Sequence, residues 1–255
     1  MIPDRFPILE FDPAREAIIE PAHIIQPRDV PEHCVICFFQ EVVAKVCAER
    51  QAATLWAPRW EDGPHPLYET TLDGQRLAFF QPGVGAAMAA GLLEEFTAAG
   101  CGKFIVCGGA GVLQREIAVG HLVVPASAVR DEGTSYHYLP PAREVPASAA
   151  GVAAIERTLT RHGVPYLLGK TWTTDAPYRE TAAKVERRRA EGCLTVEMEA
   201  AAFFAVAQFR QATLAQLLYG GDDVSGGEWD NRKWQSRTAI RENLFWLAAE
   251  ACLLL

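Results

Sequence analysis

Apolar and polar positions along the chain follow two spacings, which predict strands followed by helices. Residues 34–39 (CVICFF) are continuously apolar, as in a strand buried on both faces, and residues 40–51 carry apolar side chains at helical spacing. Two alternating runs flank Asp73 and Gly74, a pair typical of a tight β-hairpin turn. The first third of the chain therefore predicts a strand, a helix and a hairpin.

Strand-like and helix-like segments continue to alternate to the end of the chain. Several later strands are continuously apolar, which is typical of parallel strands covered on both faces. The pattern predicts one domain spanning residues 1–255, of the α/β class, with a three-layer α/β/α architecture and a mixed central sheet to which the hairpin adds an antiparallel pair. We expect strands within 103–111, 121–129, 165–175, 194–198 and 214–223, and helices near 86–99, 148–162 and 178–192, after 198 and from about Asp230.

Composition restricts the partners and the compartment. With 32 acidic and 24 basic residues, the chain has a formal net charge of -8, which gives no support to a nucleic-acid or anionic-membrane partner. The N-terminus lacks the basic and apolar regions of a signal peptide, and no apolar stretch reaches membrane-spanning length. Seven cysteines, an odd number scattered through apolar segments, indicate reduced thiols in a cytoplasmic protein.

Two motifs that often hold a metal or a cofactor are incomplete. Cys34 and Cys37 form C-x-x-C, but in a strand an odd offset sends their side chains to opposite faces, and no second C-x-x-C completes a zinc site. Residues 81–91 (QPGVGAAMAAG) match half of a dinucleotide fingerprint, with Met88 at the third glycine position. We therefore expect no metal and no cofactor, and a tight glycine turn with backbone N–H groups near a ligand.

Polar and glycine-rich segments follow the expected ends of four strands. They are GGAG (108–111), TTDAPYRET (173–181), EME (197–199) and GGDD (220–223). In open α/β sheets, ligands bind at the edge where the strands end. We expect one cleft to collect all four segments, with Gly109 among its lining residues.

Two pairs of acidic residues stand at these strand ends. In extended backbone Glu197 and Glu199 share a face, so at least one can point into the cleft, where a carboxylate suits the paired hydroxyls of a sugar. The alternative is that the pair satisfies free amides at the start of the next helix. Asp222 and Asp223 end a buried strand, where an aspartate serves as a metal ligand, a helix cap or a general acid.

Four segments resemble the nucleoside phosphorylase superfamily, which comprises purine nucleoside phosphorylases, uridine phosphorylases and nucleosidases. In the same order, within roughly residues 20–230, they are SAVRDEGTSYHYLP, WTTDAPYRET, VEMEAAAFFAVA and GGDDVSG. The resemblance implies cleavage of the N-glycosidic bond of a small-molecule nucleoside, with a purine favoured. It also implies a homo-oligomer, a dimer or a hexamer.

The resemblance assigns residues to the sugar. Glu199 would bind the sugar hydroxyls, Met198 would pack beneath the sugar, and Glu197 would support them. His23, in AHIIQPRD, matches a family histidine that reaches the sugar 5′ position of a neighbouring subunit.

Further residues are assigned to the base. Asp222 would protonate the departing purine, with Asp223 as the lesser candidate, although Gly221 stands where the family has a serine. Tyr178 would stack near the base, and Gly109 belongs to the central glycine-rich segment of the substrate site.

The phosphate-binding residues of the family are absent from this chain. CFFQE (37–41) stands where phosphorylases have G-D-P-x-R, Val106 replaces an arginine, and Ala110 replaces a hydroxyl residue. A phosphate dianion requires fixed donors and positive charge. These losses favour water as the acceptor, with Glu41 as the residue that activates it.

Other interpretations remain open at this point. Glu41 equally suits a helix N-terminal acid that interacts with the helix dipole. The chain is alternatively a phosphorylase whose phosphate site is rebuilt, for example by Arg59 or Arg130, or a non-catalytic protein that binds a nucleoside or nucleobase. Retention of Glu199, Asp222 and His23 favours an enzyme, since sensing does not require a general acid.

Overall fold

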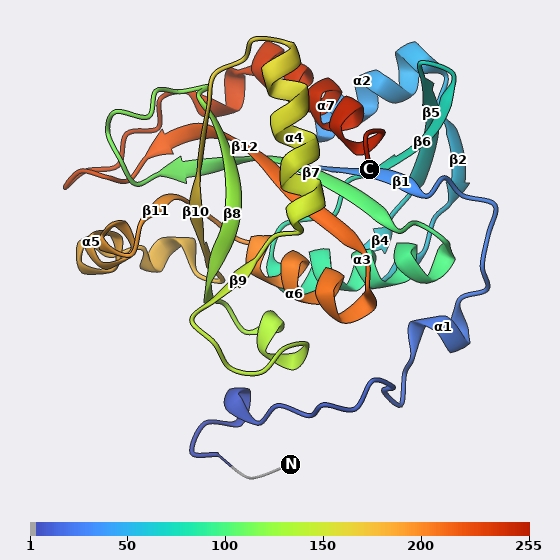
Figure 1. Cartoon of the computed structure of the whole chain (residues 1–255), viewed down its shortest axis with the longest axis horizontal. Helices are drawn as coiled ribbons and strands as arrows, with labels where there is room; N and C mark the ends of the chain where they lie inside the picture. Colours follow the sequence, from blue (N-terminus) through green and yellow to red (C-terminus); the bar gives the residue numbers. More distant parts are fainter. Residues whose placement is uncertain (1–3) are drawn as a thin grey trace.

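A ten-stranded sheet forms the middle layer of the protein (Figure 1). The computed structural model describes residues 4–255. The strand order is β11-β10-β8-β12-β7-β1-β6-β5-β2, with β9 beside β8, and β3 and β4 pair separately. The strands are β1 (His33–Cys37), β2 (Ala53–Trp56), β3 (Arg59–Trp60), β4 (Gly63–Pro64), β5 (Leu67–Leu72), β6 (Gln75–Phe80), β7 (Lys103–Val112), β8 (Leu122–Asp131), β9 (Glu144–Pro146), β10 (Tyr166–Thr174), β11 (Cys193–Glu197) and β12 (Thr213–Asp223).

Parallel and antiparallel pairings both occur in this sheet. β1 runs parallel to β6 and β7, β7 is parallel to β12, and β10 is parallel to β8 and β11. The predicted hairpin is the antiparallel pair β5–β6, and its turn residues Asp73 and Gly74 have φ of 51° and 77°. The predicted α/β class with a mixed central sheet is confirmed.

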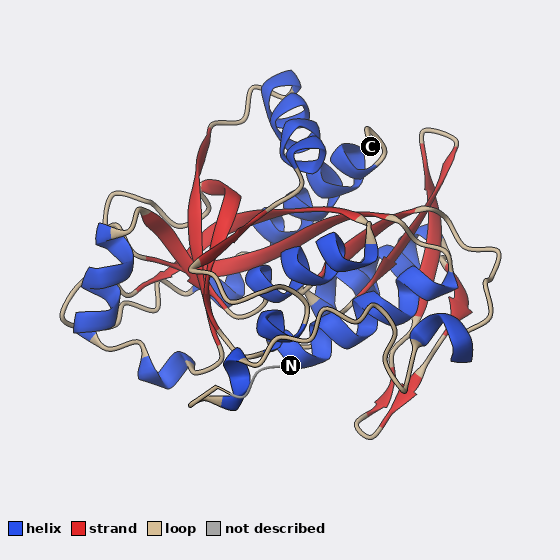
Figure 2. Cartoon of the chain, turned by 60° about the horizontal axis from the view of Figure 1, so that its bottom comes forward, coloured by secondary structure: helices blue, strands red, loops and turns tan. Residues whose placement is uncertain are grey.

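Helices cover both faces of the sheet (Figure 2). α3 and α6 pack on one face, and α2, α4 and α7 pack on the other. The α-helices are α1 (Pro21–Ile24), α2 (Gln40–Arg50), α3 (Ala86–Ala99), α4 (Ala149–Arg161), α5 (Ala182–Ala190), α6 (Ala200–Arg210) and α7 (Thr238–Cys252); short 3-10 turns are η1 (Pro7–Leu9), η2 (Thr134–His137), η3 (Pro177–Arg179) and η4 (Trp234–Ser236).

Alternation along β1 divides its side chains between two cores. Cys34 and Ile36 join the core beneath α3 and α6, whereas Val35 and Cys37 join the core beneath α2, α4 and α7. The two cysteines of the C-x-x-C therefore lie on opposite faces, as the strand spacing predicts.

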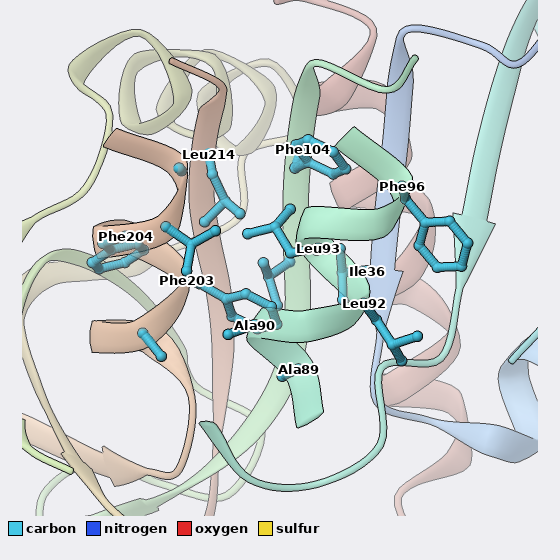
Figure 3. Packing of buried hydrophobic residues seen from close by; sticks show 14 of the residues in the cluster. Ile36, Ala89, Ala90, Leu92, Leu93, Phe96, Phe104, Phe203, Phe204 and Leu214 are labelled. Atoms are coloured by element: carbon cyan, nitrogen blue, oxygen red, sulfur yellow. The ribbon is translucent and has the colours of Figure 1, made fainter. Parts of the chain in front are cut away.

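Packing between α3 and α6 positions the start of both helices. Leu93 of α3 and Phe203 of α6 are fully buried in one core, together with Phe104 and Leu214 from the strands beneath (Figure 3). Because the two helices lie side by side on the sheet, their N-terminal ends meet near the end of β11.

The structure differs from the sequence prediction at four places. The segments 108–111 and 220–223 lie within β7 and β12 rather than after them. Their glycines permit close packing between strands: a Cβ on Gly109 would lie 3.1 Å from the Tyr219 ring, and one on Gly220 would lie 2.8 Å from Val112. α7 begins at Thr238, not near 230, and α5 begins at Ala182 after η3.

No helix within residues 4–255 combines the length and the hydropathy needed to cross a lipid bilayer.

Gly151 provides a test of the packing between α4 and β12. A Cβ at this position would lie 2.6 Å from the Cβ of Ala215 and 3.1 Å from its backbone nitrogen. We expect Gly151→Ala to lower the free energy of unfolding by about 1–3 kcal/mol, measured by urea denaturation, although alanine favours a helix. The control is the exposed Ala153 of α4, where Ala153→Gly should cost about 1 kcal/mol and Ala should be the better residue. A more stable Gly151→Ala variant would contradict the packing described.

Candidate active site

Two adjoining cavities lie where β7, β11 and β12 end. The wide cavity, of about 500 Å³, is lined by Tyr178, Glu180, Asp222 and Trp229, among others. The narrow cavity, of about 240 Å³, includes Phe38, Phe39, Val84, Glu199, Gln216 and Arg241. The two cavities share Gly109, Glu197, Met198 and Trp234, so a ligand can extend from one into the other.

A third cavity lies apart from these residues. It has a volume of about 460 Å³ and lies between the N-terminal segment and helices α3 and α6. None of the site residues predicted from the sequence is among its lining residues. The two adjoining cavities are therefore the candidate site.

Glu197 closes the start of α6. Its carboxylate accepts hydrogen bonds from the backbone N–H groups of Glu199 and Ala200, at 2.7 and 2.6 Å, and from the hydroxyl of Thr173 at 2.6 Å. The first-turn amides of α6 thus find an acceptor, as the alternative interpretation of the pair expects. Burial raises the pKa of Glu197 against the opposing effect of these donors.

Glu199 points away from the first turn of α6, toward the glycine turn before α3. Its Oε1 accepts the backbone N–H of Gly85 at 2.6 Å, and the side chain lies against the narrow cavity with 5% exposure. Gly83 and Gly85 have φ of 73° and 104°, which favour glycine and turn the Gly85 amide toward the carboxylate. Burial raises the pKa of Glu199, and the charge of Glu197 raises it further.

Asp222 and Asp223 separate because consecutive strand residues point to opposite faces. Asp222 lines the wide cavity and accepts the indole N–H of Trp229 at 2.6 Å. Asp223 accepts the backbone N–H of Ser225 at 2.8 Å and pairs with Arg232 at 2.5 Å, outside both cavities. Burial opposes ionisation of Asp223, but these partners outweigh it and lower the pKa.

Tyr178 and Glu180 lie on and just after η3, beside the wide cavity. Tyr178 is 98% exposed and stands at the cavity wall without being packed. Burial, and then the negative charge of Asp222, raises the pKa of Glu180 to about 7. Glu180 belongs to the segment TTDAPYRET (173–181), but its sequence position alone did not predict a role for it.

Glu41 lies outside both cavities. It belongs to the first turn of α2, its side chain is 42% exposed, and it pairs with Arg241 Nη1 at 2.7 Å. Its position therefore agrees with a helix N-terminal acid and does not support contact with an attacking water. Arg241, which comes from α7, does line the narrow cavity and lies over the ring of Phe39 at 4.4 Å.

The two arginines considered as substitutes for the phosphate site also lie elsewhere. Arg130 is buried and donates to Ser135 Oγ and to the carbonyl oxygens of Pro140 and Leu139. Arg59 is exposed on β3. Neither is among the residues that line the wide or the narrow cavity.

His23 is exposed on α1 and is not among the residues lining either cavity of its own chain. This placement leaves it available for the site of a second chain. Within residues 4–255, no group of three or more His, Cys, Asp or Glu side chains is arranged to hold a metal ion.

Glu180 allows a test of the electrostatics of the wide cavity. With a pKa of about 7 in the folded protein and an ordinary value of 4.5, the folded state binds more protons between these pH values. Protonated Glu180 therefore contributes to the free energy of unfolding at low pH, and this contribution is lost as pH rises through about 7. Glu180→Gln retains the neutral form, and because the half-buried side chain is partly screened we expect a gain of about 1 kcal/mol at pH 8 that shrinks toward pH 5.

The measurement is urea denaturation at both pH values. Glu186→Gln, at an exposed position of the neighbouring α5, is the matched control and should change stability little at either pH. A gain that is the same at pH 5 and pH 8 would contradict the assignment.

Comparison with known proteins agrees with this architecture. A guanosine phosphorylase from Halorubrum lacusprofundi is 32% identical over 148 residues, 56% of this chain, and the match spans 60% of that relative. A uridine phosphorylase from Treponema pallidum is 31% identical over 204 residues, covering 74% of this chain and 76% of the relative. The crystal structure of an AMP nucleosidase from Bacteroides thetaiotaomicron has the same fold, with a TM-score of 0.71, 21% identity and coverage of 88% and 87%. The model of the phosphorylase superfamily matches residues 32–245, and the chain belongs to this family of nucleoside phosphorylases and nucleosidases.

Proposed function

We propose that the protein cleaves the N-glycosidic bond of a nucleoside across the two cavities. The observation that carries the proposal is the placement of two carboxylates: Glu199 lines the narrow cavity, Asp222 lines the wide cavity, and Met198 lines both. A sugar in the narrow cavity and a base in the wide cavity would place the glycosidic bond over Met198. The guanosine and uridine phosphorylases similar to this chain support this class of substrate.

Each carboxylate has a part in the cleavage. The Glu199 carboxylate would accept hydrogen bonds from sugar hydroxyls while the sugar gains positive charge, as in glycoside cleavage. Asp222 would give its proton to the departing base, beside Tyr178 and Trp229. Glu180, with a pKa of about 7, is a second acid in the same cavity.

A purine is the proposed base, because an aspartate at this position suits protonation of a purine. Because one of the relatives is a uridine phosphorylase, base release should first be measured from a panel of nucleosides. Two observations bear on the acceptor of the sugar. The missing phosphate residues favour water, whereas Arg241 in the narrow cavity favours an anion.

Asp222→Asn is the test of the proton donor. The variant keeps the shape of the side chain but cannot donate a carboxylic proton, so we expect base release to fall about 100- to 10,000-fold. The matched control is Asp223→Asn, which should lower stability by weakening the pair with Arg232 but retain most turnover in the folded protein. Equal turnover of the Asp222 variant and the wild type would contradict the role of Asp222 as proton donor. If the wild type binds a base but shows no turnover, the protein would instead be a non-catalytic sensor.

His23 allows a test of a site shared between subunits. We expect the protein to form at least dimers, in which His23 of one chain reaches the sugar bound by the other. His23→Ala and Asp222→Asn should each be inactive alone, but a refolded mixture should regain about a quarter of the wild-type activity, because hybrid dimers contain one complete site. A mixture as inactive as its components, or a fully active monomer in light scattering, would remove His23 from the site.

A further inference from the structure

The two carboxylate oxygens of Asp222 have different surroundings. Oδ2 accepts the indole N–H of Trp229 at 2.6 Å. Oδ1 lies beside β7, since a Cβ built on Gly111 would be 3.5 Å from it, and Gly111 also lines the wide cavity. Because an indole N–H only donates, the contact with Trp229 occupies Oδ2 as an acceptor and leaves Oδ1 for a proton or a ligand.

Glu180 brings a second carboxyl group to the wide cavity from a different element. It follows η3, before the start of α5, and its side chain is half-buried. The charged groups that act on it are Asp222 from β12 and Lys184 from α5, and Lys184 also pairs with Asp131 at 3.2 Å. Glu197 lines the same cavity, but its carboxylate already accepts two backbone amides of the α6 junction.

The walls around Glu180 and Asp222 disfavour two negative charges. Val196, Val224 and Trp234 are among the apolar residues that line the cavity with them. When two carboxyl groups share such a space, ionisation of one makes ionisation of the other harder. Burial, and then the charge of Asp222, accordingly raises the pKa of Glu180 to about 7. Below this pH the two groups keep a proton between them.

We propose that Glu180 and Asp222 act as one carboxyl pair, which keeps a proton in the wide cavity and gives it through Asp222 to the departing base. The proposal rests on the proposed nucleoside site. Glu180 is then a positioning residue, because it acts on the proton of Asp222 rather than on the bond that breaks.

The proton transfer is balanced with respect to charge. The bond between C1′ and the base nitrogen breaks, and its electron pair goes to the base. The base takes the proton from Asp222, and the acceptor forms the new bond to C1′. When the acceptor is water, it loses a proton to the solvent. The pair, left with both carboxylates ionised, takes up a proton from the solvent before the next turnover.

The pH dependence of base release tests the pair. In the wild type, kcat/KM should fall as pH rises through about 7, where the pair loses its last proton. Glu180→Gln removes the like charge that helps to keep this proton, so we expect the falling limb to move down by at least about one pH unit. A residue that only supports the structure would instead lower kcat/KM by the same factor at every pH.

Three further variants complete this measurement. Glu180→Asp keeps a carboxyl group and should return the limb toward its wild-type position. Trp229→Phe keeps an aromatic ring but removes the donor to Asp222, which favours the ionised carboxylate, so the limb should move to higher pH. Glu186→Gln, at an exposed position of α5, is the matched control and should leave the limb in place.

Carbon-13 NMR of the side-chain carboxyl groups measures the pair without a substrate. Glu180 should titrate near pH 7 in the wild type, and its signal is identified by its loss in Glu180→Gln. In Asp222→Asn, which keeps the shape of the side chain but removes the like charge, Glu180 should titrate at lower pH.

The outcomes separate the pair from the proposed function. A limb that moves in Glu180→Gln, together with a Glu180 titration that depends on Asp222, supports the pair. Base release with a limb that Glu180→Gln leaves in place overturns the pair but leaves the proposed function intact, and so does a Glu180 titration that Asp222→Asn does not change. A titration that depends on Asp222, without base release from any nucleoside, supports the shared proton but overturns the proposed function and the transfer to a base.

Discussion

Two buried carboxylates at the start of α6 fix the geometry of the whole candidate site. Glu197 collects the Thr173 hydroxyl and two backbone amides of the α6 junction, which ties β10, β11 and α6 together. Glu199 accepts the Gly85 amide and so joins α6 to the start of α3. Because a buried carboxylate is costly without donors, these elements cannot move apart independently. Met198 is held between the two carboxylates, on the wall that both cavities share.

Hydrophobic periodicity predicted most of the layers, because it reports which faces of an element are buried. The hairpin at Asp73–Gly74 and the opposite orientations of Cys34 and Cys37 follow from strand geometry alone. Glycine is harder to interpret from the sequence, since the same residue permits a turn or a close approach of strands. At Gly109 and Gly220 the neighbouring Tyr219 and Val112 require the close approach, and a linear sequence does not show these contacts.

The candidate site was predictable where strand ends carried acids and glycines. Glu197, Met198, Glu199, Asp222 and Gly109 do line the two cavities, as the pattern at the sheet edge predicts.

Arg241 could not be found in this way, because an arginine on an amphipathic helix has the same pattern whether it faces solvent or a cavity. Gln216 could have been noticed in the sequence, because it is a single amide in the apolar run LAQLLY. The position of Glu41 depends on its contact with the distant α7, which no local pattern encodes.

The backbone contact between Asp223 and Asp230 has a consequence for how this family member can change. Two reciprocal hydrogen bonds, at 2.8 and 3.0 Å, pin both ends of the segment 224–229, which carries Trp229 to the carboxylate of Asp222. The flanking pair secures the closure of the segment, and doubling its length would add only about 0.6 kcal/mol of closure entropy. A change within this segment would therefore reshape the wall of the wide cavity, while the strand that carries Asp222 keeps its register.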